Sequence, residues 1–273
     1  MTTRRPKLLL LSLAVFLVLV LLFFRPSPFR PLPSSPFISA ASCPKIPESL
    51  AEVIIHYAAS NATPQQTYAE ISVTARVLRR RSPCRFLVFG LGIDSPMWAA
   101  LNHGGRTVFL EEDESWIATV HRRFPSLEIY HVRYDTRVRE AETLMEIGRG
   151  PDCSDAGLVS GSACRLALKG LPEAFESEEW DLIMVDAPTG WVQEAPGRMG
   201  AIYTAGMAAR GRRREGETDV FVHDVDRKVE DEFSRAFLCD GYQKEQEGRL
   251  RHFTIPSHRD KKPAAPFCPN SIL

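Results

Sequence analysis

Short apolar runs alternate with amphipathic stretches along most of the chain. The apolar runs end at glycine, proline or acidic residues, which is typical of buried parallel strands. They cover residues 85–90, 107–110, 128–134, 180–186, 218–225 and 249–256. Hydrophobic positions at helical spacing separate them, over residues 114–124, 136–147, 197–209 and 227–238. This alternation predicts an α/β domain with a mostly parallel sheet and helices on both faces.

Two amphipathic helices are expected before the first strand. Their apolar faces consist of Ile46, Leu50, Val53, Ile54 and Tyr57 in the first helix and of Tyr68, Ile71, Ala75 and Leu78 in the second. This spacing is that of a helix with one buried side.

The N-terminus has a different pattern. Residues 8–24 (LLLLSLAVFLVLVLLFF) carry no charge and reach the lower end of the roughly 17–25 apolar residues that a transmembrane helix needs. A cleaved signal peptide is the alternative, but its apolar region is shorter and ends at small residues, whereas this run ends in Phe-Phe-Arg-Pro. We therefore expect a cytosolic tail over 1–7 and a transmembrane signal anchor over 8–24, oriented weakly by the basic residues that precede it.

The rest of the chain divides into a linker and a domain. Residues 25–45 are rich in proline and serine, a composition typical of an extended stalk. Residues 46–273 have the size of one α/β domain. The whole chain is formally neutral, but its first 30 residues contain basic and no acidic groups. The remainder is therefore slightly acidic, which argues against non-specific nucleic-acid binding.

Six cysteines are present, an even number that is compatible with disulfides in a lumenal domain. The sequence leaves their pairing open. Cys84 begins an apolar strand and is expected to be a buried free thiol. No CxxC pair occurs, which argues against a zinc ribbon or a thioredoxin-type motif. Asn61 begins a glycosylation sequon, whose use the sequence also leaves open.

Polar residues follow the first strand, where ligands bind in such sheets. Gly90 and Gly92 let the backbone approach a ligand closely, and the helix that starts near Asp94 and Ser95 offers free N–H groups. The third glycine of the dinucleotide fingerprint is missing. A plain tight turn is therefore the alternative to a cofactor-binding turn.

Acidic residues follow the second and third strands. Glu111 comes about 20 residues after the glycines, which is the spacing of an acid that accepts hydrogen bonds from a ribose. Asp113 is an alternative ligand or the cap of the next helix. Asp135 follows the third strand and is expected near an adenine, or as a helix cap.

Three further polar residues are expected to converge at the same edge of the sheet. Asp186 ends the fourth strand, and His223 and Asp224 lie at the end of the fifth. Burying a charged group costs free energy unless the group is paired or has a catalytic role. Structural ion pairs with arginines are therefore the alternative to catalysis. Arg198, after the fourth-strand loop, could bind a carboxylate through two parallel hydrogen bonds.

At these residues the chain resembles the plant glucuronoxylan 4-O-methyltransferases and the related irregular-xylem proteins of xylan synthesis. The motifs that carry the resemblance are FLVFGLGIDSPMWAALNHGGRTVFLEEDESW (86–116), WDLIMVDAPTGW (180–191), EAPGRMGAIYTAGMAAR (194–210), DVFVHDVDRKVEDEFSRAFLC (219–239) and GRLRHFTIP (248–256). Ile93 and Asp226 depart from the family pattern, which would have histidine and asparagine there. The first departure puts a ligand role for that side chain in doubt.

The resemblance implies a Rossmann-like methyltransferase fold that binds S-adenosylmethionine, on a single-pass type II anchor in the Golgi membrane, with the domain over 46–273 in the lumen. It implies glucuronoxylan as the acceptor and association with other xylan-synthesis enzymes. Two other classes remain open, a non-catalytic protein of xylan synthesis and a nicotinamide-dependent sugar oxidoreductase.

Methyl transfer to a sugar hydroxyl needs alignment of the reacting atoms and a base for the proton. Asp186 or His223 is the candidate base, and Asp224 would orient His223 or act itself. Alternatively, these carboxylates hold a divalent metal that lowers the pKa of the hydroxyl. The sequence does not decide between the two versions.

Overall fold

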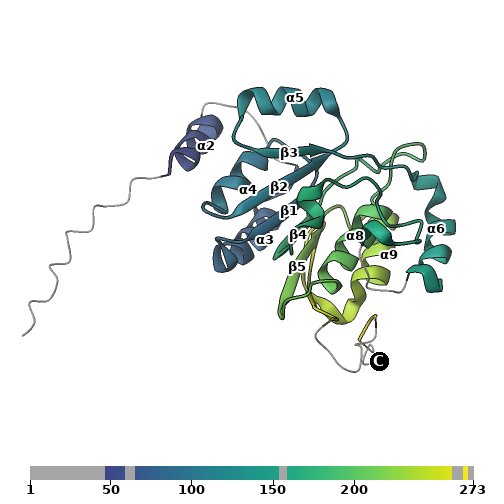
Figure 1. The fold of residues 1–273 in the computed structure, drawn as a ribbon. Coiled ribbons are helices and arrows are strands. Elements are labelled where there is room, and N and C mark those ends of the chain that lie inside the picture. The colour runs from purple at the N-terminus through teal and green to yellow at the C-terminus, as the bar shows by residue number, and fades with distance from the viewer. Residues whose placement is uncertain (1–46, 59–64, 154–158, 260–266, 270–273) are drawn as a thin grey trace, which may run out of the picture. The chain divides into compact units, whose positions relative to one another are not determined.

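A seven-stranded sheet forms the centre of the part of the chain that the structure describes, residues 47–58, 65–153, 159–259 and 267–269 of a computed structural model (Figure 1). Its strands are β1 (Arg85–Phe89), β2 (Arg106–Glu111), β3 (Glu128–His131), β4 (Leu182–Val185), β5 (Glu217–Val222), β6 (Gln243–Glu247) and β7 (Leu250–Pro256). Their order is β3-β2-β1-β4-β5-β7-β6. Strands β1 to β5 are parallel, whereas β7 is antiparallel to β5 and β6 to β7. The predicted mostly parallel sheet is confirmed.

Helices cover the sheet on both faces, as expected. They are α2 (Glu48–Ala58), α3 (Tyr68–Arg81), α4 (Ser95–Leu101), α5 (Glu114–Arg123), α6 (Ala141–Gly148), α7 (Glu173–Glu176), α8 (Met199–Arg210) and α9 (Lys228–Ser234), which continues as a π-helical turn over Arg235–Cys239. One core joins β-strand residues to α6, α8 and α9, and a second core joins them to α3, α4 and α5. Alternate residues of β1 point into different cores: Leu87 and Phe89 into the first, Phe86 and Val88 into the second. Burial on both faces is the reason why this strand is apolar throughout.

Two elements begin or end several residues from their predicted positions, and one strand was not predicted. The helix expected over 136–147 begins only at Ala141, after a 3₁₀ turn over Val138–Glu140. The strand expected over 128–134 ends at His131. Strand β6 was not predicted, because as a half-exposed edge strand of sequence QKEQE it lacks an apolar face.

The described cysteines form two disulfides, with which the even cysteine count was compatible. Cys153 pairs with Cys164 and Cys239 with Cys268, which assigns two of the pairings that the sequence left open. Cys84 is free and buried, as predicted, and burial raises the pKa of its thiol to about 12.

The predicted anchor, the predicted stalk and the sequon at Asn61 all lie outside the described residues. Among the residues that are described, no helix has both the length and the apolar character that a bilayer crossing requires.

Candidate active site

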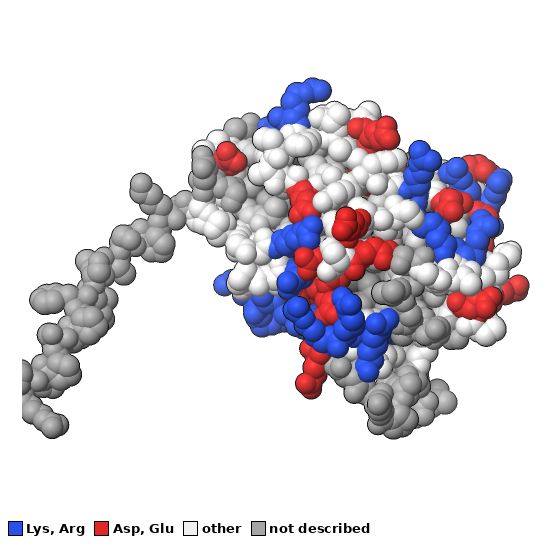
Figure 2. All heavy atoms as spheres, viewed as in Figure 1, with Lys and Arg blue, Asp and Glu red and all other residues white. Residues whose placement is uncertain are grey.

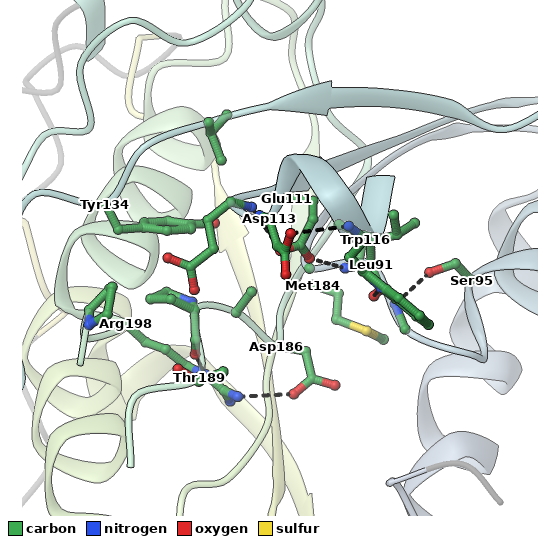
Figure 3. A pocket seen from close by; sticks show the side chains of 18 of the residues that line it. Leu91, Ser95, Glu111, Asp113, Trp116, Tyr134, Met184, Asp186, Thr189 and Arg198 are labelled. Atoms are coloured by element: carbon green, nitrogen blue, oxygen red, sulfur yellow. Dashed lines mark hydrogen bonds and ion pairs between the residues drawn. The ribbon is translucent and has the colours of Figure 1, made fainter. Parts of the chain in front are cut away.

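The loops after β1, β2, β3 and β4 open into one cavity at the carboxyl edge of the sheet (Figure 3). Its volume is about 1520 Å³, which is enough for a nucleoside-sized cofactor together with a sugar. Eight of the residues predicted from the sequence line it: Gly90, Gly92, Asp94, Ser95, Glu111, Asp135, Asp186 and Arg198. His223 and Asp224 lie behind this wall rather than in it.

The turn after β1 requires glycine. Gly90 has φ +122°, and a Cβ there would lie 3.2 Å from the Cβ of Ala187 on the neighbouring β4 loop. A side chain at Gly90 would therefore be strained and would crowd the β4 loop. The Gly92 N–H donates to Ser95 Oγ at 2.9 Å, which folds the turn onto the first residue of α4.

Asp94 lies at the edge of this turn. Its Oδ2 accepts a hydrogen bond from Trp98 Nε1 at 2.8 Å. Burial, and next the negative charge of Asp186, raise the pKa of the Asp94 carboxyl. The Asp94 and Asp186 carboxyl groups, which both line the cavity, thus interact through their charges.

Glu111 joins the turn after β1 to the loop after β2. Its Oε2 accepts from the Leu91 N–H at 3.0 Å, and its Oε1 accepts from the N–H groups of Glu112 and Asp113 at 2.8 and 3.0 Å (Figure 3). A carboxylate offers about four acceptor sites, so room remains for a hydroxyl donor from the cavity. Asp113 instead caps α5, accepting from the N–H groups of Ser115 and Trp116.

Tyr134 and Asp135 follow β3 on the same side of the cavity. Tyr134 is buried, its hydroxyl has no hydrogen-bond partner among the described residues, and burial followed by the charges of Glu111 and Glu112 raises its pKa well above the usual value. Asp135 is exposed and lines the cavity. It is not the cap of α6, because that helix begins at Ala141.

Asp186 directly follows β4 and faces the cavity with 21% of its side chain exposed. Its Oδ1 lies 3.1 Å from His223 Nδ1 and 3.3 Å from Arg198 Nη2. Its Oδ2 accepts from Gln66 Nε2 at 3.1 Å. Three side chains therefore fix the carboxylate while leaving one of its edges accessible.

His223 lies directly behind Asp186 and is fully buried. Its Nδ1 is 3.5 Å from Asp224 Oδ1, and its Nε2 is 3.7 Å from Glu70 Oε2. The structure thus brings Asp186, His223 and Asp224 together as the sequence predicted, with one ligand atom from each within 4.8 Å of the others. Their individual roles stay predictions.

The charges of this group are coupled. Burial acts to raise the pKa of Asp186, but the hydrogen bond with His223 and the charge of Arg198 outweigh it and hold the pKa below its usual value. Burial acts to lower the pKa of His223, but the same hydrogen bond and the charges of Asp186 and Asp224 raise it. Near neutral pH the pair therefore favours a carboxylate beside an imidazolium.

The Asp224 carboxylate pairs with arginine side chains and does not line the cavity. It adopts φ +61°, an uncommon conformation for a residue other than glycine. Its Oδ2 lies 2.9 Å from both Arg198 Nη2 and Arg227 Nη2, and its Oδ1 is paired with Arg249. These ion pairs match the alternative in which the carboxylate pairs with arginines. Asp224 is therefore a residue that supports the site from behind.

Arg198 is almost completely buried. Its Nε donates to the Pro188 carbonyl at 2.8 Å and its Nη1 to the His223 carbonyl at 3.0 Å, while Nη2 contacts Asp186 and Asp224. Contact with a glucuronate carboxylate stays a prediction, but the observed contacts favour a positioning role that ties the β4 loop to the end of β5.

The basic run over 210–214 is also engaged within the protein. Arg210 is buried against Phe267, Arg212 pairs with Asp181 at 3.0 Å, and Arg213 pairs with Glu179 at 3.3 Å. On the face shown in Figure 2, acidic and basic side chains lie next to one another.

Several site residues were not found from the sequence. Gln66 and Glu70 precede the sheet and reach the end of β4 and β5 only through the fold. Glu70 carried a signal of another kind, since Thr67 and Glu70 form the capping box of α3. Trp191 and Arg227 line the cavity from loops, where sequence periodicity gives no information.

The part of the sequence that contains the cavity-lining strands matches the model of a known protein family. The family model IRX15/IRX15L/GXM matches residues 69–253, a range that includes all of these strands. The chain belongs to this family. The match covers the turn at Gly90, the acid at Glu111 and the group around Asp186, so these site residues lie in the part that the family shares.

Named methyltransferases are among the relatives of the chain. It is 62% identical to glucuronoxylan 4-O-methyltransferase 1 of Arabidopsis thaliana over 233 residues, 84% of this chain and 83% of the relative. It is 50% identical to arabinogalactan O-methyltransferase 2 of the same plant, covering 79% of this chain and 76% of the relative. It is 35% identical to its protein IRREGULAR XYLEM 15, covering 87% of this chain and 74% of the relative. The family prediction is confirmed.

A solved O-methyltransferase from Bacillus cereus in complex with SAH is a remote likeness. It shares 16% identity and a TM-score of 0.40, covering 81% of this chain and 94% of that one. This likeness adds nothing to the family assignment.

Proposed function

We propose that this protein transfers the methyl group of S-adenosylmethionine to O-4 of the glucuronic acid side chains of glucuronoxylan. The observation that carries the proposal is the placement of the Asp186 carboxylate in the wall of a cavity that Gly90 and Glu111 also line. A base and a cofactor site thus share one cavity. Identity of 62% to a named glucuronoxylan methyltransferase supports this acceptor.

The residues present fit the cofactor. Gly90 adds no side chain to the cavity, and Glu111 retains acceptor capacity for ribose hydroxyls. Asp135 lies on the loop after β3, where the adenine would contact the protein. When bound, S-adenosylmethionine supplies an electrophilic methyl group.

Asp186 is the proposed general base. Its lowered pKa keeps it ionised at neutral pH, so it can accept the proton of the acceptor hydroxyl as the new bond forms. His223 and Gln66 hold it in place through contacts of 3.1 Å each. Asp186 is a weak base, but this matters less because the alignment of the acceptor oxygen with the methyl group contributes much of the rate.

Metal assistance is a second version of this mechanism. Asp186, His223 and Asp224 offer ligand atoms within 4.8 Å of one another, a spacing that suits a divalent ion. Arg198 already neutralises both carboxylates at 3.3 and 2.9 Å, so an ion must compete with its guanidinium. Loss of activity with a chelator and recovery with added metal would establish this version.

Arg227 is the proposed partner of the glucuronate carboxylate. It lines the cavity with 32% of its side chain exposed, whereas Arg198 is buried. Its Nη1 donates to the Thr189 carbonyl at 2.9 Å and its Nη2 pairs with Asp224, which leaves further N–H donors free for an anion.

We also propose that the anchor over 8–24 holds the domain in the Golgi lumen, a compartment that permits its disulfides. Protease treatment of sealed Golgi vesicles should leave the domain intact. Digestion from outside, or an N-terminus that begins near Phe24, would contradict this arrangement.

The deciding experiment is incubation of the full chain with labelled S-adenosylmethionine and glucuronoxylan, followed by identification of 4-O-methylglucuronic acid after acid hydrolysis. Arabinogalactan serves as the competing acceptor, because a relative at 50% identity is named for it. If only arabinogalactan became labelled, the acceptor would be arabinogalactan and not glucuronoxylan. Absence of donor binding would favour a non-catalytic role, and binding of a nicotinamide cofactor would favour an oxidoreductase.

A further inference from the structure

Trp191 is unusual among the tryptophans of the chain. Its side chain is 73% exposed, whereas Trp98 and Trp180 are 1% and 3% exposed. It also lines the cavity, on the same loop as Asp186 and five residues after it. A large apolar ring that is exposed beside a ligand cavity gains free energy when a ligand covers it, because apolar surface is then removed from water.

The exposure of Trp191 does not come from a loose loop. Arg198 and Arg227 donate to the carbonyls of Pro188 and Thr189, just before it. On its other side, the N–H groups of Val138 and Arg139 donate to the carbonyls of Ala195 and Gln193. The loop is therefore fixed at both flanks, and the indole is presented on a rigid backbone.

The position of Trp191 favours the acceptor over the donor. The proposed donor contacts come from the loops after β1, β2 and β3, at Gly90, Glu111 and Asp135. Trp191 comes instead from the loop after β4, which carries the proposed base. Trp191 is thus carried by the same loop as the group that is proposed to contact the acceptor hydroxyl.

We infer that Trp191 is a stacking platform for a neutral pyranose ring of the xylan backbone, next to the glucuronic acid that is methylated. This inference rests on the proposed function. The axial C–H face of a pyranose is apolar, so it can cover an indole face without burying an unpaired polar group. The charged glucuronate, in contrast, needs Arg227. The platform would make a polymer bind better than the isolated sugar acid.

The test measures binding by calorimetry on the full chain, so that it does not depend on turnover. The ligands are a xylo-oligosaccharide with one glucuronic acid branch, free glucuronic acid, and S-adenosylmethionine. Trp191→Ala should weaken binding of the oligosaccharide at least about tenfold, within the range of aromatic stacking. Binding of free glucuronic acid and of the donor should stay unchanged. Trp191→Phe should keep most of the affinity.

Val192→Ala is the matched control. Val192 is the adjacent residue of the same loop, is 44% exposed and does not line the cavity, so its truncation should leave all three affinities unchanged. Equal oligosaccharide affinity in the wild type and Trp191→Ala would overturn the inference, as would an equal loss of donor affinity. Failure of the proposed function is distinct, because the wild type would then bind neither S-adenosylmethionine nor the branched oligosaccharide.

Discussion

Asp186 and His223 directly follow the adjacent parallel strands β4 and β5, and their Oδ1 and Nδ1 atoms lie 3.1 Å apart. Only one of them reaches the cavity, because Asp186 lines it and His223 is fully buried. This arrangement separates the group that can touch the acceptor from the group that orients it.

Asp186→Asn should slow methyl transfer without weakening donor binding. The variant keeps the shape of the side chain but removes the negative charge, so it should bind the donor nearly normally and transfer methyl at least about 100-fold more slowly. Calorimetry and initial rates measure the two effects. Asp240→Asn is a control that removes an exposed ion pair with Arg235 and should keep the wild-type rate. A near-normal rate in the well-folded Asp186→Asn variant would show that Asp186 is not the base.

The pH profile should identify the base. The pKa of Asp186 is lowered and that of His223 is raised, so the Asp186 carboxylate is ready to accept a proton at all pH values above the ordinary Asp range. The acid limb of kcat should therefore lie below about pH 4. If neutral His223 were the base, the acid limb would instead lie above about pH 6.5. Rates across this interval decide between the two.

The same shifts predict how stability changes with pH. Asp186 contributes stability that is present above its unfolded pKa of about 3.9 and is lost as pH falls. His223 contributes stability that is present below its unfolded pKa of about 6.5 and is lost as pH rises through its raised folded value. His223→Gln should therefore lose less stability than the wild type as the pH rises above about 6.5. Parallel slopes of melting temperature against pH for both proteins would contradict this.

Glu111→Gln should weaken donor binding. The amide cannot accept from three backbone N–H groups and a ribose as a carboxylate does, and a hydrogen bond to a charged group is worth about 1.5–3 kcal/mol. Asp113→Asn is the matched control, since Asp113 caps α5 and is one of the N–H partners of Glu111. It should lower stability by at most about 1 kcal/mol and keep donor affinity. Equal donor affinity in Glu111→Gln would assign Glu111 to structure alone.

Gly90→Ala should destabilise the fold without any ligand. The positive φ and the contact at 3.2 Å with Ala187 together should cost about 1–3 kcal/mol in the free energy of unfolding. Gly161→Ala is a control with open space around the added methyl group. Denaturant titration of both variants should show a lower midpoint for Gly90→Ala only.

The sequence by itself determined the sheet and the positions of the main site residues along its edge. Strands β1, β2, β4 and β5 are buried on both faces over most of their length, so each contains a continuous apolar run that is visible in the sequence. In a parallel sheet the ends of these runs meet at one edge, which is why Asp186 and His223 could be expected near one another.

Tertiary structure alone decided which of these groups face the cavity. Gln66 contacts Asp186 across 120 residues, and Arg198 is buried among carbonyls and carboxylates from distant parts of the chain. Local patterns report periodicity and burial, which depend on near neighbours in the chain. Charge pairing and exposure depend on distant segments that only packing brings together, so the burial of Arg198 and the exposure of Trp191 had no signal in the sequence.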